Sequence, residues 1–95
     1  MKIVHHPESN KFAAIAEDNS QLGEIQYTVH EQGLLHATHT WTNPEARGKG
    51  VATALLDGLA DFARQSGAKI VPVCKFVVRS FHDNPDKYRD VMRQS

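Results

Sequence analysis

The sequence predicts a mixed α/β fold (an α+β mixed sheet) in which antiparallel strands lead into a β-α-β unit and helices follow at the C-terminus. Apolar and polar residues alternate in 23–31 and in 34–42, which is typical of strands buried on one face. Apolar residues recur at steps of three and four through 48–66, which indicates an amphipathic helix. The short apolar run 68–73 is typical of a parallel or central strand.

The two alternating strands each have a face that we expect to be buried. In 23–31 the residues of this face are Ile25, Tyr27 and Val29. In 34–42 they are Leu35, Ala37, His39 and Trp41. A further strand is expected at 11–17, before a turn. Asn43-Pro44 ends the strand 34–42, because proline has no amide hydrogen to donate to a sheet.

The long helix, predicted for 48–66, has one apolar stripe, which consists of Ala52, Leu55, Leu56, Leu59, Phe62 and Ala63. Gly67 is its expected end, because glycine readily adopts the left-handed conformation that closes helices. Since this helix joins them, the strands 34–42 and 68–73 are expected to lie parallel, with a right-handed crossover.

Two more helices are predicted after the last strand. The first covers 74–81, although it contains two valines. The second covers 86–93, with Asn84-Pro85 at its start, because proline is well tolerated in the first position of a helix.

Length, charge and cysteine content narrow the possible functions. A chain of 95 residues, 40% of them hydrophobic, suits one domain spanning 1–95. Eleven basic residues balance eleven acidic ones, which argues against a general nucleic-acid binder. The one cysteine, Cys74, excludes an intramolecular disulfide and a multi-cysteine zinc site, and we expect no metal. No stretch has the features of a signal peptide or a membrane span, so we expect a cytoplasmic protein.

Two glycines and two basic residues lie where the long helix is about to begin, in Arg47-Gly48-Lys49-Gly50. The first amides of a helix lack intrahelical acceptors and carry partial positive charge. Glycines let a bulky anion approach the backbone, and the two basic side chains add full charges. A strand, such a loop and a helix in this order form a site for a phosphate or pyrophosphate. The alternative is a polar loop in which the glycines only let the chain turn.

Two well-known phosphate-binding loops do not match this segment. A Walker A loop would need glycine at Asn43 and serine or threonine at Gly50. A Rossmann loop would need glycine at Thr53. A phosphoryl-transfer domain would also need a carboxylate cluster for magnesium, which the sequence does not show.

The segment Arg47-Gly48-Lys49-Gly50-Val51-Ala52 matches the pattern Q/R-x-x-G-x-G/A, placed after a strand and opening a helix. On this match the chain resembles the GNAT superfamily of acetyl-coenzyme A-dependent N-acetyltransferases. It is most similar to a short, single-domain branch with an R-G-K/R-G loop and a cysteine just after the next strand, as in Val71-Pro72-Val73-Cys74. The resemblance implies a minimal GNAT-like fold whose two parallel strands splay apart to admit the cofactor.

The resemblance also implies how acetyl-coenzyme A, the acyl donor, would be held. Its pyrophosphate would be bound by backbone amides of Arg47, Gly48, Lys49, Gly50, Val51 and Ala52. Its pantetheine arm would pair with strand 34–42 around Trp41 and Thr42, where a backbone amide would polarise the thioester carbonyl. Pro72 fits a splay point, because a missing donor costs least where strands part; an edge strand that tolerates the proline is the alternative.

The acceptor implied by the resemblance is an amine of a small molecule or a peptide. Larger members have one or two helices between their first two strands, where this chain has only residues 17–21. The strands after the final helix are also missing. The acceptor site is therefore expected to be shallow or to be completed by a second copy, which leaves a monomer and a homodimer both open.

The proton donor usual in the family is missing here. Many members carry a tyrosine in an N-x-x-A-x-x-x-Y spacing, and it protonates the departing thiolate. Aligned on Cys74, this spacing falls on Val77 and Phe81, and phenylalanine has no proton to donate. Cys74 is itself a candidate nucleophile or proton donor, because the start of a helix favours a thiolate. A small core residue is the alternative.

His39 is the candidate general base, because it lies on the strand expected to line the cofactor. A half-buried structural histidine is the alternative. His36 is expected on the opposite face of the strand, so the two histidines form no metal pair. Trp41 is expected to face the core, with a pantetheine contact as the alternative. Tyr88 is the remaining phenol that could donate a proton; its expected role is packing, with proton donation as the alternative.

Two hypotheses about function follow from these residues and from the resemblance. The first is an acetyl-coenzyme A-dependent N-acetyltransferase that acts on an unidentified amine. The second is a non-catalytic module that binds or senses acyl-coenzyme A, which the missing tyrosine and the small acceptor site favour. Binding without acetyl transfer would distinguish the second from the first.

Overall fold

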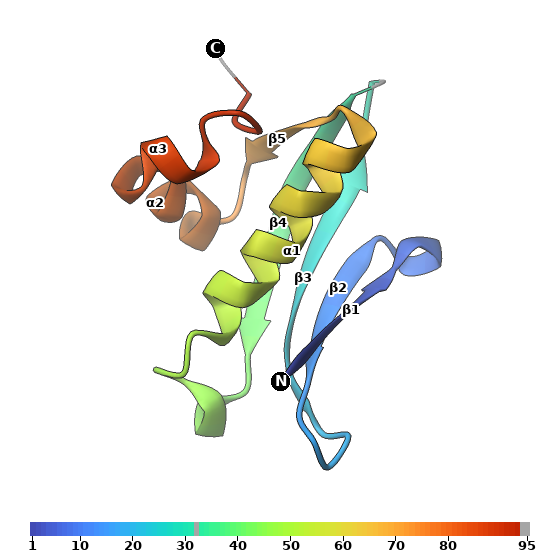
Figure 1. Ribbon diagram of the computed structural model, residues 1–95, viewed down its shortest axis with the longest axis vertical. Helices are drawn as coiled ribbons and strands as arrows, with labels where there is room; N and C mark the ends of the chain where they lie inside the picture. The colour runs from blue at the N-terminus through green and yellow to red at the C-terminus, as the bar shows by residue number, and fades with distance from the viewer. Residues whose placement is uncertain (32, 94–95) are drawn as a thin grey trace.

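A computed structural model of the chain describes residues 1–31 and 33–93. In this part of the chain five strands form one mixed sheet, and a long helix crosses one of its faces (Figure 1). The strands are β1 (Lys2–His6), β2 (Lys11–Ile15), β3 (Gln21–Val29), β4 (Leu34–Thr42) and β5 (Lys69–Pro72). The helices are α1 (Val51–Ser66), α2 (Lys75–Asp83) and α3 (Pro85–Tyr88), with 3-10 turns η1 (Pro7–Ser9) and η2 (Pro44–Ala46). The predicted mixed α/β fold is confirmed.

The strands lie in the sheet in their order along the chain. Neighbours from β1 to β4 are antiparallel, whereas β4 and β5 are parallel and are joined by α1, as predicted. The sequence analysis does not predict β1. This strand has only two apolar residues, and its position depends on pairing with β2, from Lys2 opposite Ile15 to His6 opposite Lys11.

Helix α1 begins later than predicted, at Val51 rather than at residue 48. Gly48 and Gly50 have φ angles of +83° and +75°, and a right-handed helix needs negative φ. The two glycines therefore belong to the turn that precedes the helix. At the other end, Gly67 closes α1 as predicted, and its amide donates to carbonyls of the last turn.

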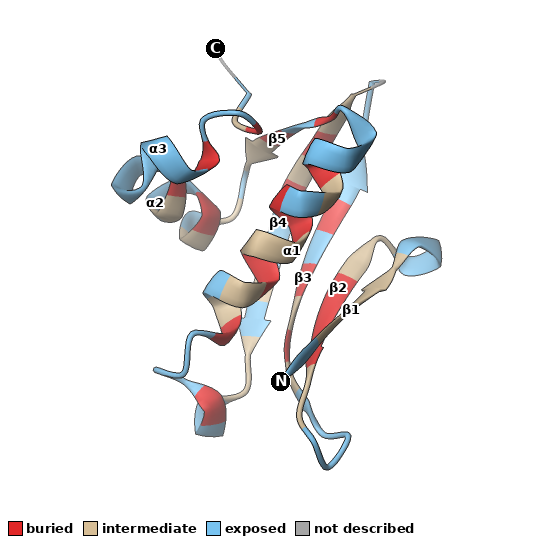
Figure 2. Cartoon of the chain, viewed as in Figure 1, coloured by how far each residue is buried: buried red, intermediate tan, exposed pale blue. Residues whose placement is uncertain are grey.

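The core lies between α1 and the face of the sheet that α1 covers (Figure 2). The helix contributes Val51, Leu55, Leu56, Leu59, Ala60 and Ala63, and the strands contribute Phe12, Ala14, Ile25, Tyr27, Leu35, Ala37 and Ile70. Val29, at the end of β3, is 58% exposed. We call the face beneath α1 the inner face of the sheet and the other one the outer face.

A bulge in β4 changes the direction of its side chains. Ala37 lies opposite Tyr27, and His39 lies opposite Gln26, so Thr38 has no residue of its own opposite it in β3. One extra residue in a strand reverses the alternation of the side chains that follow it. The side chains in the second half of β4 therefore point to the opposite faces from those expected from the sequence.

Two expectations for β4 are wrong because of this bulge. Leu35 and Ala37 are buried beneath α1, but His39 and Trp41 lie on the outer face. Trp41 is 42% exposed and is not a core residue. His36 precedes the bulge and also lies on the outer face, so it shares a face with His39 rather than opposing it.

The C-terminal helices differ in how well they match the prediction. Helix α2 covers the predicted segment, with Cys74 immediately before it. Helix α3 ends at Tyr88, so the predicted helix is wrong beyond this residue. The chain instead turns and pairs with the free edge of β5: the Ile70 amide donates to the Val91 carbonyl at 2.6 Å, and the Arg93 amide donates to the Ile70 carbonyl at 3.0 Å. Closing an exposed strand edge outweighs the local preference for a helix.

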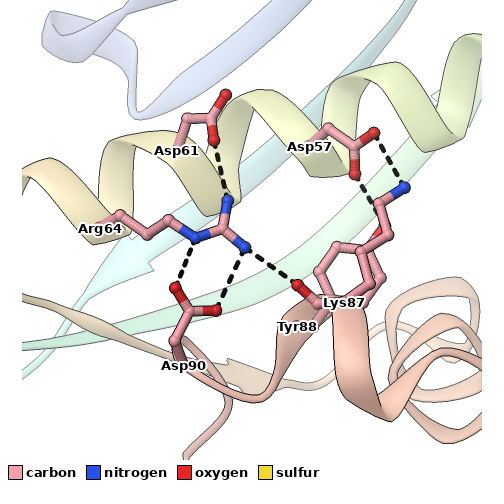
Figure 3. A network of polar contacts seen from close by, with 6 residues as sticks. All are labelled: Asp57, Asp61, Arg64, Lys87, Tyr88 and Asp90. Atoms are coloured by element: carbon pink, nitrogen blue, oxygen red, sulfur yellow. Dashed lines mark hydrogen bonds and ion pairs between the residues drawn. The ribbon is translucent and has the colours of Figure 1, made fainter.

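Two polar clusters attach α3 and the turn after it to α1 (Figure 3). Arg64 on α1 binds the Asp90 carboxylate at 2.6 Å, and this bond holds the pKa of Asp90 below its usual range. Asp57, about two helical turns earlier, accepts from the Tyr88 hydroxyl at 2.8 Å and from the Lys87 ammonium at 3.1 Å. Burial, and then Asp57, raises the pKa of Tyr88.

Candidate functional site

The segment between β4 and α1 forms a turn whose backbone is exposed at the N-terminus of the helix. Within it, the Asn43 side chain accepts a hydrogen bond from the Glu45 amide at 3.0 Å. Ala46 is buried and holds the turn against the core. The two left-handed glycines, Gly48 and Gly50, then lead into α1. Only glycine takes this conformation without strain, which explains the spacing seen in the sequence.

The first turn of α1 leaves its amides available for a ligand. The first helical hydrogen bond runs from the Ala54 amide to the Gly50 carbonyl at 3.0 Å. The amides of Val51, Ala52 and Thr53 have no acceptor among the described residues. No side chain caps the helix, and its first turn contains no acidic residue. The positive end of the helix dipole is therefore open to an external anion.

A cavity of about 280 Å³ opens at this end of α1. It is lined by Thr42, Ala46, Arg47, Gly48, Gly50, Val51, Ala52 and Thr53. A Cβ atom added at Gly48 or Gly50 would meet no atom within 4 Å, so both backbones face open space. Arg47 and Lys49 are exposed and form no ion pair with the described residues. This cradle of free amides and cations fits a pyrophosphate.

The parallel strands β4 and β5 part before β4 reaches this cavity at Thr42. Pairing of β4 with β5 ends where Ala37 lies opposite Pro72. The Ala37 carbonyl accepts from both the Val73 amide, at 3.1 Å, and the Cys74 amide, at 3.0 Å. Beyond this point β5 ends, while β4 continues through residues 38–42. Pro72 lies at the end of the pairing and in the outermost strand, which agrees both with a splay point and with an edge strand that tolerates the proline.

The second half of β4 has a free backbone edge where β5 has ended. The Asn43 amide donates to the Leu22 carbonyl at 2.7 Å, so this amide faces β3. Backbone groups of successive strand residues point to alternate sides, so those of Trp41 also face β3. The amides of Thr40 and Thr42 consequently face the open edge. Of the two residues predicted to pair with a pantetheine arm, Thr42 presents its backbone there and Trp41 does not.

Cys74 lies at this opening. It is the residue that precedes α2, and it is half-buried. Its Sγ atom lies 3.4 Å from the Thr40 Oγ1 atom, across the gap between the parting strands. The side chain of Thr40 is directed to the inner face, because His39 and Trp41, its neighbours in β4, are directed to the outer one. The thiol therefore adjoins the free edge of β4 from the inner side.

His39 is not brought together with Cys74. Its side chain is exposed on the outer face and has no hydrogen-bond partner among the described residues. Its neighbour on that face, His36, packs its ring against His30 with centroids 3.7 Å apart. The two catalytic candidates thus lie on opposite faces of β4, and the structure contains no Cys74–His39 pair.

The positions that would hold the family's proton donor are core positions here. Val77 is fully buried and Phe81 is 3% exposed. The Phe81 ring packs against Tyr88 with centroids 5.1 Å apart. Tyr88 is also buried, and its hydroxyl donates to Asp57. Packing, the role expected for Tyr88, is what the structure shows.

Thr40 is the residue near the opening that the sequence analysis does not identify. A regular strand would direct its side chain to the outer face, and no sequence signal marks the bulge that reverses it. The described residues contain no group of three or more histidine, cysteine, aspartate or glutamate side chains that could hold a metal ion. None of the helices in residues 1–31 and 33–93 is long and apolar enough to cross a membrane.

Solved structures similar to this chain share its arrangement of strands and helices. A GCN5-like protein of Staphylococcus aureus, solved by NMR, is 29% identical, with a TM-score of 0.74 over 99% of this chain and 89% of its own. A ribosomal-protein-alanine N-acetyltransferase of Brucella melitensis is 23% identical, with a TM-score of 0.63. An acetyltransferase of Bacillus cereus is 18% identical, with a TM-score of 0.65. The latter two support the fold alone.

The two larger proteins extend well beyond the part that this chain matches. The alignment covers 90% of this chain but 62% of the Brucella protein, and 86% of this chain but 64% of the Bacillus one. No curated protein matches the sequence. The sequence model of the family described as GCN5-related N-acetyl-transferase, however, matches residues 11–91. The chain therefore belongs to this family of acyltransferases, and the predicted family resemblance is confirmed.

Proposed function

We propose that the protein is an N-acetyltransferase that uses acetyl-coenzyme A and transfers the acetyl group to an amine of a small molecule or peptide. The observation that carries the proposal is the set of free amides at the first turn of α1, next to the free edge of β4. A diphosphate attached to a long, amide-containing arm is the ligand that both features fit at once. The proposal treats residues 1–95 as one cytoplasmic acyltransferase domain.

In this proposal each part of the donor has its own set of residues. The turn 47–52 binds the pyrophosphate through backbone amides, and the side chains of Arg47 and Lys49 neutralise its charge. The pantetheine arm pairs with the free edge of β4 at Thr42 and Thr40. Trp41 contributes only through its position in the strand. The backbone amide of Thr40 is then available to polarise the thioester carbonyl.

Two routes for the acetyl group use Cys74 differently. In the first, the amine attacks the thioester carbonyl, the bond to the coenzyme sulfur breaks, and Cys74 gives its proton to the departing thiolate. In the second, the Cys74 thiolate attacks first, a bond forms between its sulfur and the acetyl carbon, and the coenzyme leaves as a thiolate. The amine then takes the acetyl group and releases the Cys74 thiolate.

His39 suits the amine rather than the thiol. It lies on the outer face of β4, whereas Cys74 approaches from the inner side. An amine that enters from the outer face meets an exposed imidazole that can accept its proton. We therefore propose His39 as the general base for the acceptor.

The first experiment is a calorimetric titration of the protein with acetyl-coenzyme A, followed by an acetyl-transfer assay over a panel of amines and peptides. We expect binding that weakens with salt, because charge contributes to it. If acetyl-coenzyme A did not bind, the proposal would be wrong. Intact mass after incubation with acetyl-coenzyme A alone separates the two routes: an acetyl adduct that Cys74→Ala abolishes supports the covalent one. Wild-type turnover in Cys74→Ala would exclude the residue from both routes.

A second candidate function is a module that binds acyl-coenzyme A without turning it over. The burial of Phe81 where relatives place a proton donor, and the separation of Cys74 from His39, favour this alternative. Tight binding of acetyl-coenzyme A with no acetyl transfer to any member of the panel would support it. The oligomeric state, measured by light scattering with and without the ligand, tests whether a second copy completes the acceptor site.

A further inference from the structure

Thr40 and Cys74 are 34 residues apart in the chain, yet their side chains meet at the opening between β4 and β5. The hydroxyl and the thiol lie 3.4 Å apart, within hydrogen-bond distance for sulfur. Among the described residues, each of these side-chain groups has the other as its one hydrogen-bond partner. The contact is partly buried, so water competes with it less than at the surface.

Two irregularities of the backbone create this contact. The bulge at Thr38 directs the side chain of Thr40, rather than that of His39, to the inner face. The Ala37 carbonyl accepts from two successive amides, those of Val73 and Cys74, and so turns the chain at the end of β5. Without the bulge the residue facing the thiol would be an imidazole; with it, the residue is a hydroxyl.

We propose that Thr40 is a positioning residue for Cys74: its hydroxyl donates a hydrogen bond to the sulfur and holds it toward the free edge of β4. This inference rests on the proposed function, because that edge is where the thioester would lie. When the sulfur carries a proton, the same contact is kept with the thiol as donor and the Thr40 oxygen as acceptor. The sulfur thus keeps one direction in both protonation states.

The placement also explains why a hydroxyl suits this position better than a histidine. An imidazole next to the thiol would compete for the proton that the departing thiolate needs in the direct route. A hydroxyl orients the sulfur but neither takes nor supplies a net proton near neutral pH. The bulge therefore separates orientation of the thiol, on the inner face, from acceptance of the amine's proton, on the outer face.

The test compares Thr40→Val, which keeps the branched shape and removes the hydroxyl, with Thr40→Ser, which keeps the hydroxyl. Thr28→Val is the matched control, because it removes an exposed hydroxyl from the outer face of β3. Since Cys74 is the one cysteine, its alkylation by iodoacetamide at pH 7.5 is read directly from intact mass. The kcat of acetyl transfer and the KM for acetyl-coenzyme A are measured on the same variants.

We expect Thr40→Val to slow alkylation and to lower kcat, each roughly fivefold, which corresponds to the loss of one hydrogen bond of about 1 kcal/mol. The KM for acetyl-coenzyme A should not change, because the backbone amide of Thr40 remains. In Thr40→Ser the alkylation rate and kcat should both stay within about twofold of the wild type. Thr28→Val should behave as the wild type.

Wild-type alkylation in Thr40→Val would overturn the inference, as would a Thr40→Ser variant as impaired as the valine variant. A melting temperature within a few degrees of the wild type establishes that each variant is folded. Failure of the proposed function has a different signature, which is the absence of acetyl-coenzyme A binding in the wild type. The alkylation comparison still decides whether Thr40 controls the sulfur in that case.

Discussion

Gly50 and Gly67 stand at the two ends of α1 with nearly the same backbone angles, φ +75° and φ +72°. A side chain added at either glycine would project into open space. At the C-terminal end, the Gly67 amide donates to the Ala63 and Arg64 carbonyls, so groups left free by the helix are satisfied. At the N-terminal end, the amides that follow Gly50 have no acceptor among the described residues.

The comparison shows that the same residue in the same conformation satisfies backbone groups at one end of the helix and leaves amides available at the other. Ends of helices with unsatisfied groups are usually capped by a side chain, and a cap contributes about 1 kcal/mol. α1 has no such cap at its N-terminus, because Gly50, the residue before the helix, has no side chain and lies in the left-handed conformation. The missing cap leaves room for an external anion. The following predictions test this difference between the two ends.

The largest expected effect distinguishes Gly50→Ala from Gly67→Ala. Both place a methyl group on a left-handed residue, so each should lower the free energy of unfolding by about 1 kcal/mol, or about 5 °C in melting temperature. Gly50→Ala should in addition weaken acetyl-coenzyme A binding by at least about tenfold, because its methyl group enters the pyrophosphate cradle. Calorimetry and thermal unfolding of the two variants measure both quantities.

The same pair also provides its own control. If Gly67→Ala weakened binding as much as Gly50→Ala, the loss would be due to general destabilisation of α1. If Gly50→Ala bound acetyl-coenzyme A like the wild type, the N-terminal end would not be the anion site.

A smaller effect is expected from the charges at the N-terminal end. Removing both cations, in Arg47→Ala/Lys49→Ala, should weaken acetyl-coenzyme A binding roughly three- to tenfold at low salt, with little change in stability. The difference from the wild type should shrink as the salt concentration rises. Lys2→Ala, an exposed cation of β1, is the matched control. An unchanged affinity in the double variant would show that the backbone alone binds the anion.

At the C-terminal end, charge should affect stability and not binding. Arg64→Ala removes the contact to Asp90 that attaches the C-terminal segment to α1, together with the contact to Asp61 within the helix. These groups are partly exposed, so we expect the melting temperature to fall by only a few degrees. Arg79→Ala, whose partner Asp83 is 3.7 Å away at the surface, should have no measurable effect. If the melting temperature fell equally in Arg64→Ala and Arg79→Ala, the contacts of Arg64 would have no special role in stability.

The smallest expected effect concerns pH. His5 stacks on Phe12 with centroids 4.1 Å apart and bonds to the Tyr27 hydroxyl at 2.7 Å, beside Phe62 near the C-terminal end of α1. Burial, partly offset by Glu8, lowers the pKa of His5 below its ordinary value of 6.5. The unfolded chain therefore binds a proton more readily than the folded one as pH falls through 6.5.

Stability should accordingly be retained above pH 6.5 and decrease as the pH falls toward the lower folded pKa. The measurement is urea unfolding from pH 7.5 to pH 5 of the wild type and of His5→Gln, which lacks the titrating group. A slope between pH 6.5 and 5 that is the same in both proteins would assign the pH dependence to other groups.

Prediction from the sequence was accurate where local pattern and tertiary structure agree. The burial of Ile25 and Tyr27 in 23–31, the apolar stripe of α1 and the closing role of Gly67 are confirmed. The predicted burial of Val29 is wrong, since this side chain lies at the end of β3 and is exposed. The order of a strand, a glycine loop and a helix is also as predicted, because glycine spacing is a local property, although the helix begins at Val51 rather than at residue 48. The errors fall where pairing between distant segments decides the structure, at β1, at the bulge of β4 and after Tyr88.

The sequence by itself determined the family, the glycine turn 47–52 that we propose as the anion site, and the presence of a lone thiol after a short strand. Only the tertiary structure decided which side chain of β4 meets that thiol. A bulge arises from how two strands pair, and it reverses every side chain that follows it. For that reason a strand read in isolation directs His39 inward, whereas in the folded sheet Thr40 lies beside Cys74 and His39 faces outward.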